Sequence, residues 1–285
     1  MYVYVKLFII KHLSKYSIDY FYTNVLFFVL QELFISKIQI DYFDDLALRA
    51  FLSLEKLTLN MANLLEAPSL PENKCYLTSL DLDHNAIVVL PGNYFEGCHV
   101  LKRLRLGYNK LISMPELSYL KNTLNFLHLE NNSISGCGSL CENPSVNDLF
   151  ASTKFISLKT ISLHSNNISD MNLVHSLPLW PSVYIVDVSN NQLTTLSDIR
   201  KSRVIGNLTV VYLKAQDNPY HCNASMAWLT EVGRTAFLNQ NNFQLGRVKI
   251  YRQNFDEMLC STPSDLYGFP IWKLSMWIVF YTQCF

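Results

Sequence analysis

The chain has 285 residues and balances 23 lysines and arginines with 23 aspartates and glutamates, so its formal net charge at pH 7 is zero. Only 16% of the residues are charged and no basic stripe runs along the sequence, which argues against binding to nucleic acid. The seven cysteines are an odd number, so they cannot all pair within one chain.

Residues 1–29 form an apolar segment without a regular targeting pattern. Lysines and an aspartate interrupt it at Lys6, Lys11, Lys15 and Asp19, so it lacks the uninterrupted apolar stretch of a signal peptide. Its longest apolar run is too short for a standard transmembrane helix. Three interpretations stay open: a degenerate cap or repeat, an incomplete start of the chain, and a signal-anchor.

One leucine pattern recurs from residue 30 to residue 215. Its clearest copy has Leu77, Leu80 and Leu82, then Asn85 three residues later and Ile87 two residues after that. The eight units begin at residues 30, 54, 77, 101, 124, 158, 183 and 208, which are 23 to 25 residues apart except for one step of 34. Self-similarity at this period predicts a leucine-rich solenoid. The predicted fold class is therefore α/β, with a curved parallel sheet on the concave side and irregular or short helical turns on the convex side.

We number the places of each unit from its first leucine, so that places four and six point inward from a short strand and place nine holds the asparagine. Amide side chains stacked at one place can satisfy backbone groups where the chain leaves the strand, each of which would otherwise cost roughly 1–3 kcal/mol. The predicted ladder consists of Asn85, Asn109, Asn132, Asn166 and Asn191. Ala62 takes place nine in the second unit, and we assign Gln216 to place nine and Tyr212 to place five in the eighth.

Outward-pointing residues of the strands and of the turns that follow them are expected to line the concave face, where a solenoid binds its partner. The candidate ligand-binding residues lie on three central units: Asp81, Asp83, His84, Arg103, Arg105, Tyr108, Phe126, His128 and Glu130. Tyrosine and arginine are the residue types that anchor interfaces. The alternative is a solvated sheet face with cross-strand pairs such as Asp81–Arg105, which contribute little.

The long step in the repeat marks an insertion at residues 136–157. Cys137 and Cys141 lie in it, where they form either a local disulfide or, less favoured, half of a zinc site with no second half in the sequence. Cys98 takes an inward place on the convex side, which favours a free thiol in the core. Cys75 stands at nearly the same place one unit earlier, so a Cys75–Cys98 disulfide is the alternative.

Residues 216–270 carry the motif Asn218-Pro219, Cys222 and Trp228-Leu229, followed later by a second cysteine segment that begins at Cys260. These motifs resemble the cysteine-rich C-terminal flanking domain of extracellular leucine-rich repeat proteins, and the stretch 90–101 resembles their typical repeat subtype. The resemblance implies a cap over the last repeat and a disulfide between Cys222 and Cys260.

The cap also departs from the family pattern, because Ala224 stands where the family has its second cysteine. Cys284 is then left without its usual partner. Met226, Trp228, Leu229 and Val232 have helical spacing, which predicts a short helix that buries Trp228 against the last repeat. Residues 271–285 form an apolar tail that is too short to span a bilayer by itself, but it would be the beginning of a membrane span, and so allow membrane association, if the chain continued past residue 285.

Four N-x-[ST] sequons begin at Asn131, Asn167, Asn207 and Asn223. Together with the cap, they favour an extracellular or cell-surface protein. Asn131 and Asn167 flank ladder asparagines and are expected to be accessible.

No phosphate-binding loop, zinc-protease motif or nucleophile elbow is present, so neither an enzyme nor a cofactor is predicted. We therefore expect a recognition or adhesion module that binds a protein ligand on its concave face, as part of a receptor or on its own. An intracellular leucine-rich scaffold or regulatory subunit is the alternative, and innate-immune pattern recognition is a further one.

Overall fold

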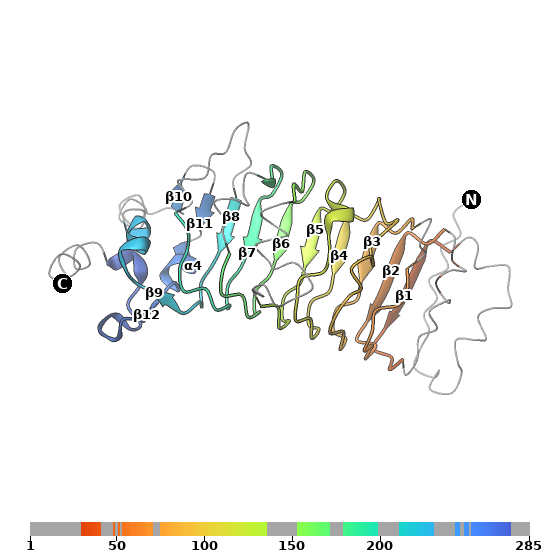
Figure 1. Cartoon of the computed structure of the whole chain (residues 1–285), viewed down its shortest axis with the longest axis horizontal. Coiled ribbons are helices and arrows are strands. Elements are labelled where there is room, and N and C mark those ends of the chain that lie inside the picture. Colours follow the sequence, from red (N-terminus) through yellow and green to blue (C-terminus); the bar gives the residue numbers. More distant parts are fainter. Residues whose placement is uncertain are drawn as a thin grey trace.

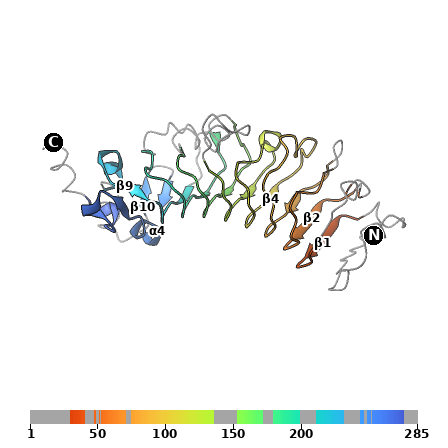
Figure 2. The ribbon, with the colours of Figure 1, turned by 60° about the horizontal axis from the view of Figure 1, so that its bottom comes forward.

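The computed structural model describes residues 30–40, 48, 51, 53–70, 75–135, 153–171, 179–198, 211–230, 243–245, 248–250 and 252–274. They form an elongated molecule in which short strands lie side by side along the long axis (Figure 1). A view turned by 60° shows that the row of strands bends into an arc (Figure 2). The segment 1–29, Cys137, Cys141, Asn207, Val232 and the tail after residue 274 lie outside the described residues.

Eight parallel strands form the main sheet in chain order. They are β1 (Glu32–Ser36), β2 (Lys56–Asn60), β3 (Ser79–Asp81), β4 (Arg103–Arg105), β5 (Phe126–His128), β6 (Thr160–Ser162), β7 (Ile185–Asp187) and β8 (Val211–Lys214). Each step from β1 to β7 pairs equivalent places of neighbouring units, as in the pairs Leu80 with Leu104 and Leu104 with Leu127. The predicted fold class and the strand positions of the first seven units are therefore confirmed.

The strands form because every unit places leucine or a similar residue on the inner side of the sheet and polar residues on the outer side. Leu80, Leu82, Leu104 and Leu106 have no exposed surface. One unit, with a single strand of three to five residues, cannot bury such a face, but stacked units bury it in a continuous core. That core runs from Leu48 to Leu274, so the solenoid and its cap share one hydrophobic interior.

The eighth strand lies two residues further along the chain than predicted. Leu213, which we assigned to place six, pairs with Val186 at place four, and Lys214 pairs with Asp187 at place five. Tyr212 therefore takes place three, and the ladder place falls on Asn218 rather than on Gln216. The assignment was wrong because Val211 and Leu213 fit the apolar pattern as well as Leu213 and Ala215 do, and the spacing alone cannot separate the two registers.

A disulfide joins Cys75 and Cys98 on the convex side of the third and fourth units, where their Cα atoms are 4.6 Å apart. The favoured prediction of a free thiol at Cys98 was wrong, and the alternative is correct. Sequence spacing places both residues near the same level of neighbouring turns, but only the stacking brings their Cβ atoms within bonding range.

The predicted insertion 136–157 ends earlier than expected. Phe155 is completely buried and takes the convex place three residues before Leu158, as Trp180 does before Val183. The backbone N–H of Ile156 donates to the carbonyl of Lys121 at 3.1 Å, so the regular coil has resumed by this point. On the convex side, the described short helical turns include η4 (Ser118–Leu120).

The C-terminal cap closes the end of the main sheet. β11 (Val248–Ile250) pairs in parallel with β8, and β10 (Phe243–Leu245) pairs antiparallel with β11, so the sheet has ten strands in all. The remaining described elements are β9 (Tyr220–His221), η7 (Ala224–Met226), α4 (Arg252–Asp256), β12 (Cys260–Thr262), η8 (Ser264–Leu266) and η9 (Ile271–Lys273).

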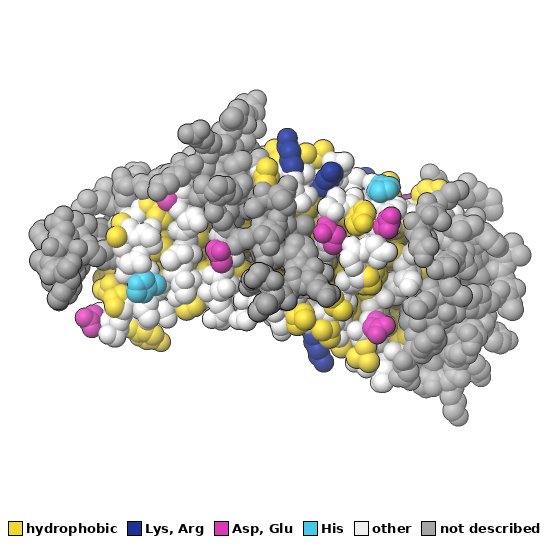
Figure 3. Space-filling view, in the orientation of Figure 1, with side chains coloured by type: hydrophobic (Ala, Val, Ile, Leu, Met, Phe, Trp, Pro, Cys, Tyr) yellow, Lys and Arg dark blue, Asp and Glu magenta, His cyan; other side chains and the backbone are white. Residues whose placement is uncertain are grey.

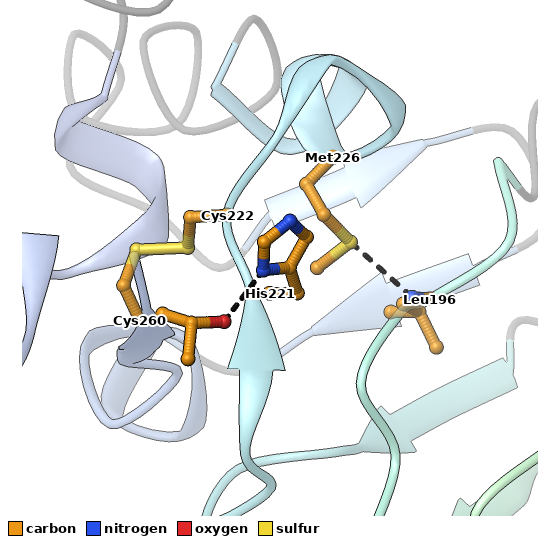
Figure 4. Close-up of a disulfide and its surroundings, with 6 residues drawn as sticks. Leu196, His221, Cys222, Met226 and Cys260 are labelled. Carbon is orange, nitrogen blue, oxygen red and sulfur yellow. Dashed lines mark hydrogen bonds between the residues drawn. A yellow bond between two sulfur atoms is a disulfide. The ribbon is translucent and has the colours of Figure 1, made fainter. Parts of the chain in front are cut away.

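The cap is tied together at the place where β9 and β12 pair. The Cys222–Cys260 disulfide links the ends of these segments, and Nδ1 of His221 lies 2.6 Å from the Thr262 hydroxyl beside it (Figure 4). Residues 227–230 are helical, as predicted, and the indole N–H of buried Trp228 donates to the Leu196 carbonyl at 3.2 Å. The helical turn is thus docked against the seventh unit.

No helix among the described residues has both the length and the apolar character needed to cross a membrane.

Candidate functional site

The asparagine ladder positions the turns that border the concave face. Oδ1 of Asn109 accepts the backbone N–H of Ile87, and its Nδ2 donates to the carbonyls of Leu82, Leu106 and Gly107 at 2.9–3.1 Å. Equivalent bonds are made by Asn85, Asn132, Asn166 and Asn191. The geometry is the one predicted for a structural ladder, because each amide satisfies polar groups of its own turn and of the preceding turn.

Asn218 extends the ladder by one unit beyond the five predicted members. Its Oδ1 accepts the N–H groups of Asn191 and Leu193, and its Nδ2 donates to the carbonyls of Val188 and Ala215 at 3.0–3.1 Å. The sequence shows Asn218 only as part of the cap motif. Once Ala215 is at place six, Asn218 is at place nine, which is the signal that could have identified it.

Place eight, immediately before the ladder, has the same unusual backbone in every unit. The residues there have φ between 50° and 59°: Lys37, Met61, His84, Tyr108, Asn131, Ser165, Asn190 and Asp217. In the first seven units their backbone N–H groups donate to the next turn, as His84 does to Gly107 and Tyr108 to Glu130. The left-handed conformation turns the chain sharply away from the sheet, and it places His84 and Tyr108 at the rim of the concave face.

The nine candidate residues form one surface over β3, β4 and β5, which we call the central patch. It comprises Asp81, Asp83, His84, Arg103, Arg105, Tyr108, Phe126, His128 and Glu130. Cross-strand pairing places Asp81 opposite Arg105 and Arg105 opposite His128. A space-filling view shows acidic, basic and histidine side chains close together on the side of the molecule where these strands lie (Figure 3).

The closest ion pair in the central patch joins Arg105 and Asp83. Nε of Arg105 lies 2.7 Å from Oδ2 of Asp83 and 3.9 Å from Oδ2 of Asp81. The expected Asp81–Arg105 pair is therefore present, but the diagonal contact is much closer. Asp83 is almost completely buried, and its other oxygen accepts the backbone N–H of Gly107 at 2.7 Å.

Because Gly107 has no side chain, a second carboxylate, that of Glu130, can approach this residue from the side away from Asp83. A Cβ atom at Gly107 would lie 3.1 Å from both Cδ and Oε1 of Glu130. Glu130 is 8% exposed, and its Oε1 lies 3.5 Å from Nδ1 of His128, whereas its Oε2 is buried without a hydrogen-bond partner. The sequence placed Gly107 on the concave face but did not show that it makes room for Glu130.

Two ring contacts occupy the remaining edges of the patch. The rings of His84 and Tyr108 are stacked, with centroids 4.1 Å apart and an interplanar angle of 14°. The guanidinium of Arg103 lies 5.3 Å from the centroid of the Phe126 ring. Both contacts restrict the motion of large side chains at the surface.

The two buried carboxyl groups respond to their surroundings in opposite directions. Burial raises the pKa of Asp83 above its ordinary value of 3.8, although Arg105 opposes this shift. Burial also raises the pKa of Glu130, but hydrogen bonds from His128, from the backbone and from Ser162 outweigh it, and the net pKa lies below 4.5. The Arg105 pKa is lowered by burial but raised more by Asp83, so its net shift is upward.

In the part of the chain that the structure describes, no group of three or more histidine, cysteine, aspartate or glutamate residues is arranged to hold a metal ion. The central patch is a polar and aromatic surface that contains the Arg105–Asp83 ion pair and the stacked rings of His84 and Tyr108.

The three sequons whose asparagines are among the described residues differ in the accessibility of those asparagines. Asn167 is exposed, and Asn131 and Asn223 are half-buried. Oδ1 of Asn223 accepts both the N–H and the hydroxyl of Ser225 at 2.9 and 2.6 Å.

Residues 75–134 match the family model described as leucine rich repeat. The fold is that of a leucine-rich repeat protein. No curated protein is similar enough in sequence to count as a relative.

Solved structures support this fold over most of the chain. A chain of the octameric complex of Latrophilin 3, Unc5D and FLRT2 (LRR) superimposes with a TM-score of 0.67 at 24% identity, covering 88% of this chain and 69% of that one. A chain of the Toll–Spatzle complex of Drosophila, in its glycosylated form, gives a TM-score of 0.62 at 19% identity. The match covers 85% of this chain and 31% of that one.

Proposed function

We propose that this leucine-rich repeat chain is an extracellular recognition module that binds a protein ligand through the central patch on its concave face, as a receptor or adhesion component. The observation that carries the proposal is the patch itself. Arginine, tyrosine and phenylalanine side chains lie exposed or half-buried around the ion pair that Arg105 forms with buried Asp83, on a sheet of eight parallel strands about 35 Å long. A surface of that length can accommodate one side of a standard protein interface.

Two disulfides support the extracellular location. Cys75–Cys98 ties two repeats together and Cys222–Cys260 ties the cap, and disulfides of this structural kind persist in oxidising compartments. They weigh against the alternative of an intracellular scaffold. The structural neighbours support a protein ligand, since both come from complexes with protein partners: Latrophilin 3 and Unc5D in one, Spatzle in the other.

The location is tested by the mass of the protein expressed in animal cells with its own N-terminus, measured before and after enzymatic removal of N-glycans. We expect a loss of mass on glycan removal, and a smaller loss in the variant Asn167→Gln. An unchanged mass would reject the secretory location and favour the intracellular scaffold.

The binding role is tested on an array of purified extracellular protein domains. Arg103→Glu reverses an exposed charge in the central patch, whereas Glu96→Lys reverses an exposed charge on the convex side and serves as the matched control. We expect a domain that binds the wild-type chain to bind the Arg103→Glu variant with at least tenfold lower affinity. The same domain should bind the Glu96→Lys variant with unchanged affinity. Equal binding of both variants would remove the central patch from the ligand site.

A further inference from the structure

The flank that follows the ladder carries a row of exposed aliphatic side chains in the second to fourth units. Leu65, Val88 and Ile112 all stand at place twelve and are 70%, 42% and 54% exposed. The same place holds Ser135, Ser169 and Thr194 in the fifth to seventh units. The flank therefore changes from aliphatic to hydroxyl side chains at a single boundary.

Neighbouring turns hold this row in register. The N–H of Lys110 donates to the carbonyl of Ile87 at 2.9 Å, and the N–H of Ile112 donates to the carbonyl of Val88 at 3.3 Å. Successive side chains of the row are consequently about 5 Å apart, the spacing of adjacent strands. Two further exposed side chains widen the surface, Met61 at place eight and Val89 at place thirteen.

These side chains contribute nothing to the hydrophobic core, and a contiguous apolar surface on a folded protein usually marks an interaction site. The positions of the sequons agree with an interaction site on this half of the flank, because none of them lies in it. Asn131 and Asn167 lie in the fifth and sixth units, and the sequence has no sequon in the second to fourth. The aliphatic half itself therefore carries no attachment point for an N-glycan.

We propose that this aliphatic flank, formed by Met61, Leu65, Val88, Val89 and Ile112, binds the same flank of a second copy of the chain in an antiparallel two-fold arrangement. A two-fold interface joins a patch to itself, so the patch must be self-complementary. An aliphatic row meets this condition because it presents no hydrogen-bonding side chain that needs a different partner. With Val88 at the centre, Leu65 of one copy faces Ile112 of the other.

The charges at the ends of the row favour a second copy over an unrelated protein. Glu66 follows Leu65 at one end and Lys110 precedes Ile112 at the other, and both are exposed. No ion pair of either side chain occurs among the described residues. The antiparallel arrangement brings Glu66 of each copy to the turn that bears Lys110 of the other, at a Cα offset of roughly 10 Å, which the two long side chains can span. Two such pairs form by symmetry.

The proposal concerns the flank and leaves the strands of the concave face open, so a dimer would present two ligand-binding surfaces.

The test is the mass of the glycosylated full chain in solution, measured by sedimentation over a range of concentrations. We expect the wild-type chain to dimerise and Val88→Glu to weaken the dimer roughly a hundredfold, because a charge would be buried without a partner. Thr194→Glu makes the same kind of change at the same place on the polar half and should leave the dimer intact. Circular dichroism and thermal unfolding establish that both variants are folded.

Charge reversal identifies the arrangement. Glu66→Lys and Lys110→Glu should each weaken the dimer several-fold, and the double variant should restore it. A wild-type chain that stays monomeric at about 100 μM, or a dimer that Val88→Glu does not weaken, would overturn the proposal. A dimer that depends on Val88 but is not restored by the double charge reversal would overturn the antiparallel arrangement.

Discussion

Replacing the ladder residue Asn109 by alanine should destabilise the solenoid substantially. The amide makes four hydrogen bonds, one from the N–H of Ile87 and three to the carbonyls of Leu82, Leu106 and Gly107. Asn109 itself is 9% exposed, so water cannot readily replace the lost groups.

Most of the free-energy cost of the substitution comes from one of these four hydrogen-bond partners. The three carbonyls each keep a second donor in the variant: Asn85 for Leu82, Asn132 for Leu106 and His84 for Gly107. The N–H of Ile87 has no such second bond and would be left unpaired in the interior. One unpaired buried N–H, together with the lost amide contacts, predicts a decrease of about 2–4 kcal/mol in the free energy of unfolding.

The free energy of unfolding is measured by urea denaturation of the oxidised protein, followed by circular dichroism. The control is Asn122→Ala, which removes the same side chain at an exposed position and should change the free energy of unfolding by less than about 0.5 kcal/mol. If Asn109→Ala is as mild as Asn122→Ala, the ladder does not stabilise the turns as argued.

Three further predictions concern the cap and the central patch. Cys222→Ser should lower the free energy of unfolding by roughly 3–4 kcal/mol and free the Cys260 thiol for alkylation, and a Cys260 thiol that stays unreactive would contradict the pairing. Gly107→Ala should cost about 1 kcal/mol in urea denaturation, because the added methyl group forces the Glu130 side chain to move, and an unchanged stability would show that Glu130 does not pack there. Glu130→Gln should lower the free energy of unfolding most above pH 4.5, because a carboxyl whose pKa is lowered by folding contributes stability above its ordinary pKa. The difference in stability from the wild type should shrink as the pH falls through the lower pKa of the folded state. A difference that grows on acidification in parallel denaturation series would reverse the sign of the assigned pKa shift.

The sequence was sufficient to predict the architecture because successive units of the repeat show the same pattern. Five asparagines and their leucines at one register predicted the stacked parallel strands, and the structure places seven of the eight units as expected. The failure in the eighth unit has a physical cause. Its two candidate registers bury comparable apolar side chains, and the choice between them depends on the amide of Asn218 reaching the turn of the seventh unit.

The candidate site was predictable at the level of a face but not of its contacts. Alternation along the strands showed that Asp81, Arg105 and His128 would lie on the same side. It did not show that Arg105 prefers Asp83 to Asp81, since that preference depends on the carboxylate held by the N–H of Gly107. The stack of His84 on Tyr108 likewise depends on the left-handed backbone that both residues share.

Periodicity along the chain determined by itself which apolar residues of strands β2 to β7 are buried, since a side chain repeated at the period of the units must meet its equivalents when the turns stack. The tertiary structure alone decided what lies between turns: the Cys75–Cys98 disulfide, the buried Glu130 over Gly107 and the aliphatic row from Leu65 to Ile112. Gly107 and Glu130 share one place of the repeat, as do the members of the aliphatic row, and Cys75 and Cys98 are within one place of each other, so periodicity makes them neighbours. A side-chain contact of a few ångströms depends on where each turn settles against the next.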